Sequence, residues 1–218
     1  MDWEFMTKED LLLHLEENSK VFKNEAIRKA FEAVDRKDFI QPDYQIEAYE
    51  DYPLPTMSGQ TISQPTTVAF MLELLDPQKG DNVLDVGSGT GWTTALLGHM
   101  VGKTGKVTGL EIRPELVEFG KENLKKYKEL PVEIRQADNE TGFFRDGPYN
   151  RILAGAAFPN KTNEAMELVF QLAPGGVMVA PIGESITKFE RVNEDEYYET
   201  EYPGFIFVPY VQKFNLES

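Results

Sequence analysis

Three glycines at alternating positions follow directly after a short apolar stretch of the chain. The stretch runs from Val83 to Val86, and the glycines are Gly87, Gly89 and Gly91. Glycine accepts positive φ, and it has no Cβ that would keep a ligand away from main-chain N–H groups. The pattern therefore predicts a strand, a loop that binds a nucleotide-type cofactor, and a following helix. A plain strand-to-helix turn is the alternative interpretation.

Two acidic residues indicate which cofactor this loop binds. Asp85 lies two residues before the first glycine, where its carboxylate would repel the pyrophosphate of a dinucleotide but attract the ammonium and sulfonium groups of S-adenosylmethionine. Glu111 closes the next apolar stretch, where a carboxylate can bind ribose hydroxyls. Taken alone, Glu111 could also be a solvated residue at a strand end. The two acids together favour S-adenosylmethionine over NAD.

Composition limits the class of protein. The chain has 218 residues and no cysteine. This length suits one domain with a substantial core. The absence of cysteine excludes disulfides, thiolate catalysis and zinc–thiolate sites, and we expect no metal centre.

Charge and hydropathy limit the partners and the location. The net charge of −15 opposes a phosphate backbone, so we expect no nucleic-acid partner. One basic cluster, at positions 121, 125, 126 and 128, is better explained as a solvated helix face. No apolar run is long enough to span a bilayer and the first residues lack a signal-peptide layout, so we expect a cytoplasmic protein away from membranes. The sequence does not indicate the oligomeric state.

The first third of the chain is predicted to contain helices and one long loop. A capping sequence at 7–10 opens a first helix, and helical periodicity predicts a second at about 24–34. Residues 41–63 have no sustained periodicity, and long ordered loops of this kind are often binding segments. Pro65 suits the first position of the next helix.

From residue 82 onward, predicted strands and helices alternate. The strands are expected at 82–86, 106–111, 132–137, 149–154 and 177–181, and the helices at about 92–101, 114–127 and 162–171. This order predicts an α/β fold with a doubly wound, mostly parallel Rossmann-like sheet that binds its ligand outside the carboxyl ends of the strands.

The end of the chain breaks this alternation. Two last strands are expected at 187–192 and 205–211, joined through the acidic stretch 193–201 with no helix between them. The sheet should therefore have seven strands and close with an antiparallel C-terminal part. We expect a single domain, in which residues 1–63 form an N-terminal helical extension with a substrate-side loop and residues 64–218 form the cofactor-binding core.

Two motifs before the glycine loop carry a family resemblance. They are Ala48-Tyr49-Glu50-Asp51-Tyr52-Pro53-Leu54-Pro55 and Gly59-Gln60-Thr61-Ile62-Ser63-Gln64-Pro65, with an echo in Phe207-Val208-Pro209. From about residue 21 to residue 181, the chain resembles the protein-L-isoaspartate O-methyltransferases. This family methylates the abnormal carboxyl group of isoaspartyl residues in damaged proteins.

The resemblance implies roles for particular residues. Ser63 would be the active-site residue, with Thr61 and Ile62 on the substrate side, and S-adenosylmethionine would be held by Asp85, Gly87, Ser88, Gly89, Gly91, Glu111 and Asp138. Ser63 also fits the N-cap of the helix at Pro65. The acceptor carboxylate is already ionised at neutral pH and needs no general base, so neither His14 nor His99 is assigned a role.

The chain departs from the family pattern in three places. It has Ala137-Asp138-Asn139 where Gly-Asp-Gly is usual, and Asn150 where an aspartate is usual; the segment 158–163 lacks the usual Ile-Pro step. These departures leave two alternatives. One is a methyltransferase of the same fold that acts on a small molecule or an RNA base, and the other is a catalytically decayed module that only binds the cofactor.

Overall fold

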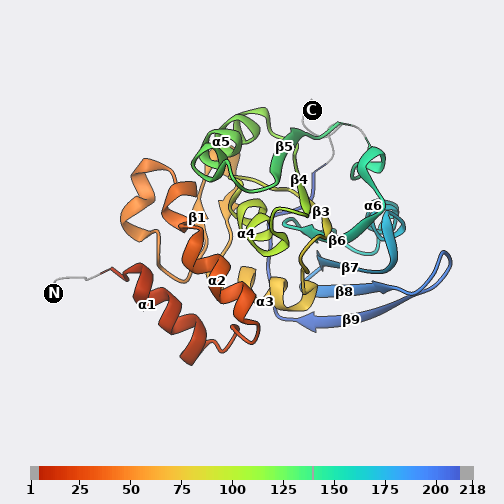
Figure 1. The fold of residues 1–218 in the computed structure, drawn as a ribbon, viewed down its shortest axis with the longest axis horizontal. Helices are drawn as coiled ribbons and strands as arrows, with labels where there is room; N and C mark the ends of the chain where they lie inside the picture. Colours follow the sequence, from red (N-terminus) through yellow and green to blue (C-terminus); the bar gives the residue numbers. More distant parts are fainter. Residues whose placement is uncertain (1–4, 139, 212–218) are drawn as a thin grey trace.

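A computed structural model of the chain describes residues 5–138 and 140–211 (Figure 1). Its centre is a seven-stranded sheet with the strand order β5-β4-β3-β6-β7-β8-β9. The strands are β3 (Asn82–Val86), β4 (Lys106–Glu111), β5 (Val132–Gln136), β6 (Tyr149–Ala154), β7 (Leu172–Ile182), β8 (Ser185–Arg191) and β9 (Tyr197–Pro203). The first five in this order are parallel, and β8 and β9 pair antiparallel to their neighbours. The expected seven-stranded, mostly parallel sheet is confirmed.

Helices cover both faces of this sheet. They are α1 (Lys8–Leu13), α2 (Glu25–Ala33), α3 (Pro65–Leu75), α4 (Trp92–Val101), α5 (Pro114–Leu124) and α6 (Asn163–Phe170). Neighbouring residues of a strand point to opposite faces, and Val83 and Leu84 accordingly belong to two separate apolar clusters. The cluster with Val83 includes Leu72 and Leu96, whereas the cluster with Leu84 includes Leu168 of α6.

The N-terminal region packs on the helical layer formed by α3 and α4 (Figure 1). Thr7 and Asp10 form the expected capping box at the start of α1, and Asn24 caps α2. The long segment 41–63 holds two short 3₁₀ helices, Pro42–Glu47 and Met57–Gly59, and a small antiparallel ribbon of β1 (Leu54–Pro55) and β2 (Thr61–Ile62). In the part of the chain that the structure describes, no helix is long and apolar enough to cross a membrane.

The predicted last strand at 205–211 is wrong. The last strand is β9, and it contains most of the acidic stretch that we expected to be a connection. β9 lies at the edge of the sheet with mostly exposed side chains, so tyrosine and glutamate replace the apolar alternation of a buried strand. Residues 205–211 instead run back toward the carboxyl ends of the parallel strands, where Pro209 forms an isolated parallel bridge with Ala157.

Candidate active site

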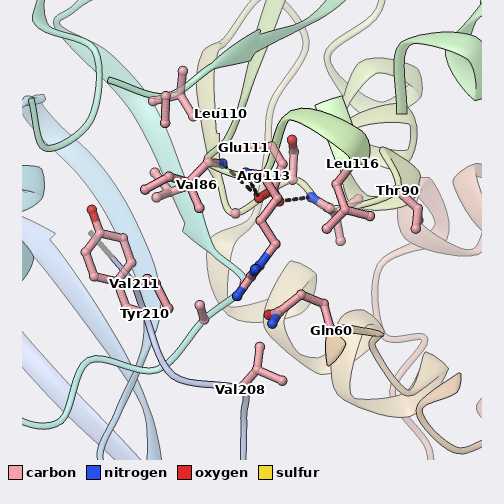
Figure 2. Close-up of a pocket in the computed structure, with 18 of the residues that line it drawn as sticks. Gln60, Val86, Thr90, Leu110, Glu111, Arg113, Leu116, Val208, Tyr210 and Val211 are labelled. Atoms are coloured by element: carbon pink, nitrogen blue, oxygen red, sulfur yellow. Dashed lines mark hydrogen bonds between the residues drawn. The ribbon is translucent and has the colours of Figure 1, made fainter. Parts of the chain in front are cut away.

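One pocket opens at the carboxyl ends of the parallel strands (Figure 2). It is lined by residues 56 and 60–63, the loop after β3, the end of β4 with the start of α5, residues 137, 138, 140–142, 155 and 156, and the C-terminal segment 208–211. Eight of the residues singled out from the sequence line it: Thr61, Ile62, Ser63, Gly87, Ser88, Gly89, Glu111 and Asp138. Asp85 and Gly91 do not line it. The structure thus brings the predicted cofactor loop and the predicted substrate loop to one cavity.

The glycine loop is fixed to the end of β4. The N–H groups of Gly87 and Ser88 donate to the Leu110 carbonyl at 2.8 and 2.9 Å. Gly87 and Gly89 have φ of +76° and +53°, values that favour glycine. A Cβ built on Gly89 would meet only the Gly87 carbonyl, at 4.0 Å, so open space lies in front of this position.

Gly91 serves packing rather than the pocket. It is the N-cap of α4 with φ of +89°, and a Cβ there would lie 3.1 Å from Cδ1 of Ile134. The third glycine therefore allows the start of α4 to approach the β5 layer closely. Its place in the motif follows from this helix–sheet contact and not from contact with the pocket.

Glu111 is a buried carboxylate surrounded by main-chain donors. Its Oε2 accepts the Gly89 N–H at 2.9 Å, and its Oε1 accepts the N–H groups of Ile112 and Arg113 at 2.8 and 2.9 Å. Only 6% of the residue is exposed. Burial raises the pKa of this carboxyl, and the three main-chain hydrogen bonds oppose the shift.

Asp85 lies behind the glycine loop instead of in the pocket wall. Its Oδ2 accepts the hydroxyls of Thr93 and Thr94, each at 2.7 Å, and its Oδ1 is buried without a partner. Burial raises the pKa of Asp85 to about 6, and the two threonine hydroxyls oppose this shift. The residue can therefore act on a ligand through its charge and through the position of the loop.

Ser63 is not a helix cap. The N-cap of α3 is Gln64, which makes no side-chain capping bond, and Asp51 satisfies the helix start instead: its carboxylate accepts the Thr66 N–H at 2.9 Å and the Thr66 hydroxyl at 2.7 Å. The Ser63 carbonyl accepts a hydrogen bond from Arg36 at 3.1 Å. Its hydroxyl has no hydrogen-bond partner among residues 5–138 and 140–211, so the N-cap interpretation of Ser63 is wrong.

Arg36 is a site-supporting residue that sequence reasoning missed. Its buried guanidinium donates to four carbonyls of the substrate-side segment, those of Ala48, Glu50, Tyr52 and Ser63, at 2.8 to 3.1 Å. It also lies over the Trp92 ring, 5.3 Å from the centroid. Burial lowers its pKa to about 10. An arginine just after a helix carries no sequence signal that separates it from a solvated one.

Three further pocket residues have buried polar atoms without a partner. They are Thr56 through Oγ1, Ser88 through Oγ and Trp92 through Nε1. Buried polar atoms in folded proteins are nearly always hydrogen-bonded, so unpaired ones in a pocket wall indicate a polar ligand. Together with the buried acids Glu111 and Asp85, they fit a ligand that carries hydroxyl and cationic groups.

Other residues from the sequence analysis lie elsewhere. Neither histidine lines the pocket; His14 Nε2 lies 3.2 Å from the Asp51 carboxylate. Asn150 is also outside the pocket, because its side chain accepts the Asn82 N–H at 2.8 Å near the opposite ends of the strands. Asn150 therefore forms no part of the pocket wall. Ala137 does line the pocket, and Asn139 lies outside the described residues.

Comparison with known proteins supports the family resemblance of the sequence. The model of the family described as protein-L-isoaspartate(D-aspartate) O-methyltransferase matches residues 6–215. A protein-L-isoaspartate O-methyltransferase of Aeropyrum pernix is 42% identical over 191 residues, which cover 85% of this chain and 72% of that protein. One of Methanothrix thermoacetophila is 36% identical over 214 residues and covers 98% of this chain and 99% of that protein.

Solved structures share the fold. The crystal structure of a Plasmodium falciparum protein described as a protein-L-isoaspartate O-methyltransferase, in complex with S-adenosyl-L-homocysteine, superposes with a TM-score of 0.81. The match covers 94% of this chain and 98% of that chain at 24% sequence identity. The seven-stranded arrangement with its pocket at the strand ends is therefore a known architecture.

Proposed function

The chain belongs to the protein-L-isoaspartate O-methyltransferase family, and we propose that its strand-end pocket holds S-adenosylmethionine beside the carboxylate that it methylates. The protein is an S-adenosylmethionine-dependent methyltransferase that acts on isoaspartyl residues of damaged peptides and proteins, a step in protein repair. One observation supports the site most strongly. The substrate-side residues Thr61, Ile62 and Ser63 face the same cavity as the glycine loop and Glu111.

The cofactor half of the pocket consists of the glycine loop, Glu111 and Asp138. Gly87 and Gly89 leave room for a ligand against the main chain. Oε2 of Glu111, which accepts the Gly89 N–H, can accept a second hydrogen bond, here from a ribose hydroxyl. Asp138, whose Oδ1 accepts the Glu140 N–H at 2.8 Å, would bond to the adenine amino group. When bound, S-adenosylmethionine supplies an electrophilic methyl group on a positively charged sulfur.

The acceptor half of the pocket has to align an anion rather than activate it. A carboxylate is ionised at neutral pH, so no general base is required, and no histidine is among the residues that line the described pocket. The free hydroxyl of Ser63 can donate to the acceptor carboxylate. Arg36 holds the Ser63 carbonyl and therefore the direction of this segment. Alignment of this kind can lower a reaction barrier by several kcal/mol.

The direct test compares an isoaspartyl peptide with its normal aspartyl twin as methyl acceptor. With S-adenosylmethionine labelled in the methyl group, we expect a labelled ester that releases methanol from the isoaspartyl peptide and none from its twin. Equal labelling of both peptides would refute the assignment. Labelling of neither peptide, together with calorimetric binding of S-adenosylhomocysteine, would indicate either a decayed module or another acceptor, such as a small molecule or an RNA base.

A further inference from the structure

The charges around the pocket are strongly uneven. Glu111, Asp138 and Glu140 line it, and Asp85 lies directly behind the glycine loop. Among the described residues that line the pocket, Arg113 is the only lysine, arginine or histidine. The acids suit a cationic cofactor, but they repel a carboxylate that has to enter the same cavity. A positive charge is therefore needed to offset the repulsion of an anionic acceptor, and among the described residues of the pocket wall Arg113 can provide it.

Arg113 is placed where it can provide this compensation. It immediately precedes α5, and its main-chain N–H is held by Glu111 at 2.9 Å. Its side chain extends away from Glu111 across the pocket toward Gln60 and the segment that contains Val208 (Figure 2). The structure has no hydrogen bond or ion pair of its guanidinium with any residue in 5–138 or 140–211. The N–H donors of its rigid fork are therefore available to a ligand in the cavity.

A contact between two segments holds the start of α5, and with it the Arg113 main chain, beside the substrate-side loop. The Ser58 hydroxyl donates to the carboxylate of Glu115, in the first turn of α5. This contact ties the 3₁₀ turn at 57–59 to the helix that begins directly after Arg113. The next residue of the loop is Gln60, which Figure 2 shows facing the Arg113 side chain. The charge of Arg113 opposes the rise that burial causes in the pKa of Glu111, and it adds to the Ser58 hydrogen bond in lowering the pKa of Glu115. The Arg113 guanidinium lies toward the acceptor side of the cavity, near Gln60 (Figure 2).

We propose that Arg113 binds the acceptor carboxylate as its counter-ion, an inference that rests on the proposed function. An arginine fork matches a carboxylate with two parallel hydrogen bonds. In the transfer, a carboxylate oxygen forms a bond to the methyl carbon as the carbon–sulfur bond breaks, and the electron pair of that bond stays on sulfur. The ester product has no charge, so its ion pair with Arg113 is lost. Arg113 therefore selects ionised acceptors and favours release of the product.

The test uses Arg113→Gln and Arg113→Lys, with Arg145→Gln as the matched control. Arg145 is exposed and lies outside the pocket. Arg145→Gln removes one positive charge, as Arg113→Gln does. With an isoaspartyl peptide whose neighbours are uncharged, we expect KM to rise at least about tenfold in Arg113→Gln, less in Arg113→Lys, and not in the control. Affinity for S-adenosylhomocysteine should stay within about twofold in all three. An isoasparagine analogue, in which an amide replaces the carboxylate, should inhibit the wild type and Arg113→Gln equally.

Three results would overturn the inference. The first is a KM within twofold of wild type in a folded Arg113→Gln protein. The second is weaker binding of S-adenosylhomocysteine with unchanged KM for the peptide, because the guanidinium would then bind the carboxylate of the cofactor. The third is a loss confined to peptides with acidic neighbours. Failure of the proposed function looks different, because the wild type itself would then not distinguish the isoaspartyl peptide from its twin.

Discussion

The carboxylate of Glu111, at the end of β4, accepts the main-chain N–H of Gly89, the middle glycine of the loop after β3, at 2.9 Å. The same carboxylate accepts the N–H groups of Ile112 and Arg113 at the start of the next helix. One side chain therefore joins the two walls of the cofactor half. Walls that are held by such hydrogen bonds cost less to order on binding.

Replacing Glu111 should affect both binding and stability. Glu111→Ala removes a charged hydrogen-bond acceptor for the ribose, and we expect S-adenosylhomocysteine affinity to fall by about 1.5 to 3 kcal/mol. Three main-chain donors lose their acceptor at the same time, so the free energy of unfolding should fall by about 1 to 3 kcal/mol. Calorimetry and denaturant titration measure the two effects. Glu118→Ala, on the exposed face of α5, is the control and should change neither.

Ser63→Ala separates chemistry from folding. We expect kcat for the isoaspartyl peptide to fall at least about tenfold, because one aligned hydrogen bond in the transition state contributes about 1.4 kcal/mol or more. The free energy of unfolding should change by less than about 0.5 kcal/mol, since Ser63 caps no helix. Asp51→Ala provides the contrast, because Asp51 accepts the Thr66 N–H at the start of α3, and its loss should cost about 1 to 2 kcal/mol of stability. A stability loss in Ser63→Ala with unchanged kcat would contradict this assignment.

Burial of Asp85 predicts a specific pH dependence of stability. Its pKa is raised from 3.8 to about 6 in the folded protein, so the folded state holds a proton that the unfolded state has released between these values. Stability from this group is therefore fully present below about pH 4 and is lost as pH rises through about 6. The difference in unfolding free energy between wild type and Asp85→Asn should fall over this interval and then level off. If this difference stays constant between pH 4 and 7, the pKa of Asp85 is not raised in the folded protein.

Arg36 is predicted to hold the substrate-side segment in place. Arg36→Lys replaces a planar fork that reaches four carbonyls by a single ammonium, and we expect a loss of about 3 kcal/mol in unfolding free energy. Limited proteolysis should then cut within residues 48–63, and kcat should fall because Ser63 loses its support. Arg28→Lys is the control, since Arg28 forms only exposed ion pairs. Equal protease resistance of wild type and Arg36→Lys would contradict the role of Arg36.

Local sequence determined the elements that build the sheet. The buried strands β3, β4 and β6 have the bounds expected from their apolar runs, because glycines, prolines and charged residues interrupt the chain on either side. The sequence also predicted the positions of the glycine loop and of the acid at the end of β4. Their spacing along the chain follows from one strand–loop–helix–strand unit, so that neighbours in sequence are neighbours in the site.

Tertiary structure alone decided the remaining features. β9 is a strand because β8 offers it an edge, although its exposed tyrosines and glutamates carry no apolar alternation. Residues 208–211 became a pocket wall, Asp51 took the capping role expected of Ser63, and Arg36 and Arg113 found their positions through segments distant in sequence. Burial and pairing of a polar side chain depend on what packs against it from elsewhere in the chain. The residue type and its immediate neighbours therefore do not specify either property.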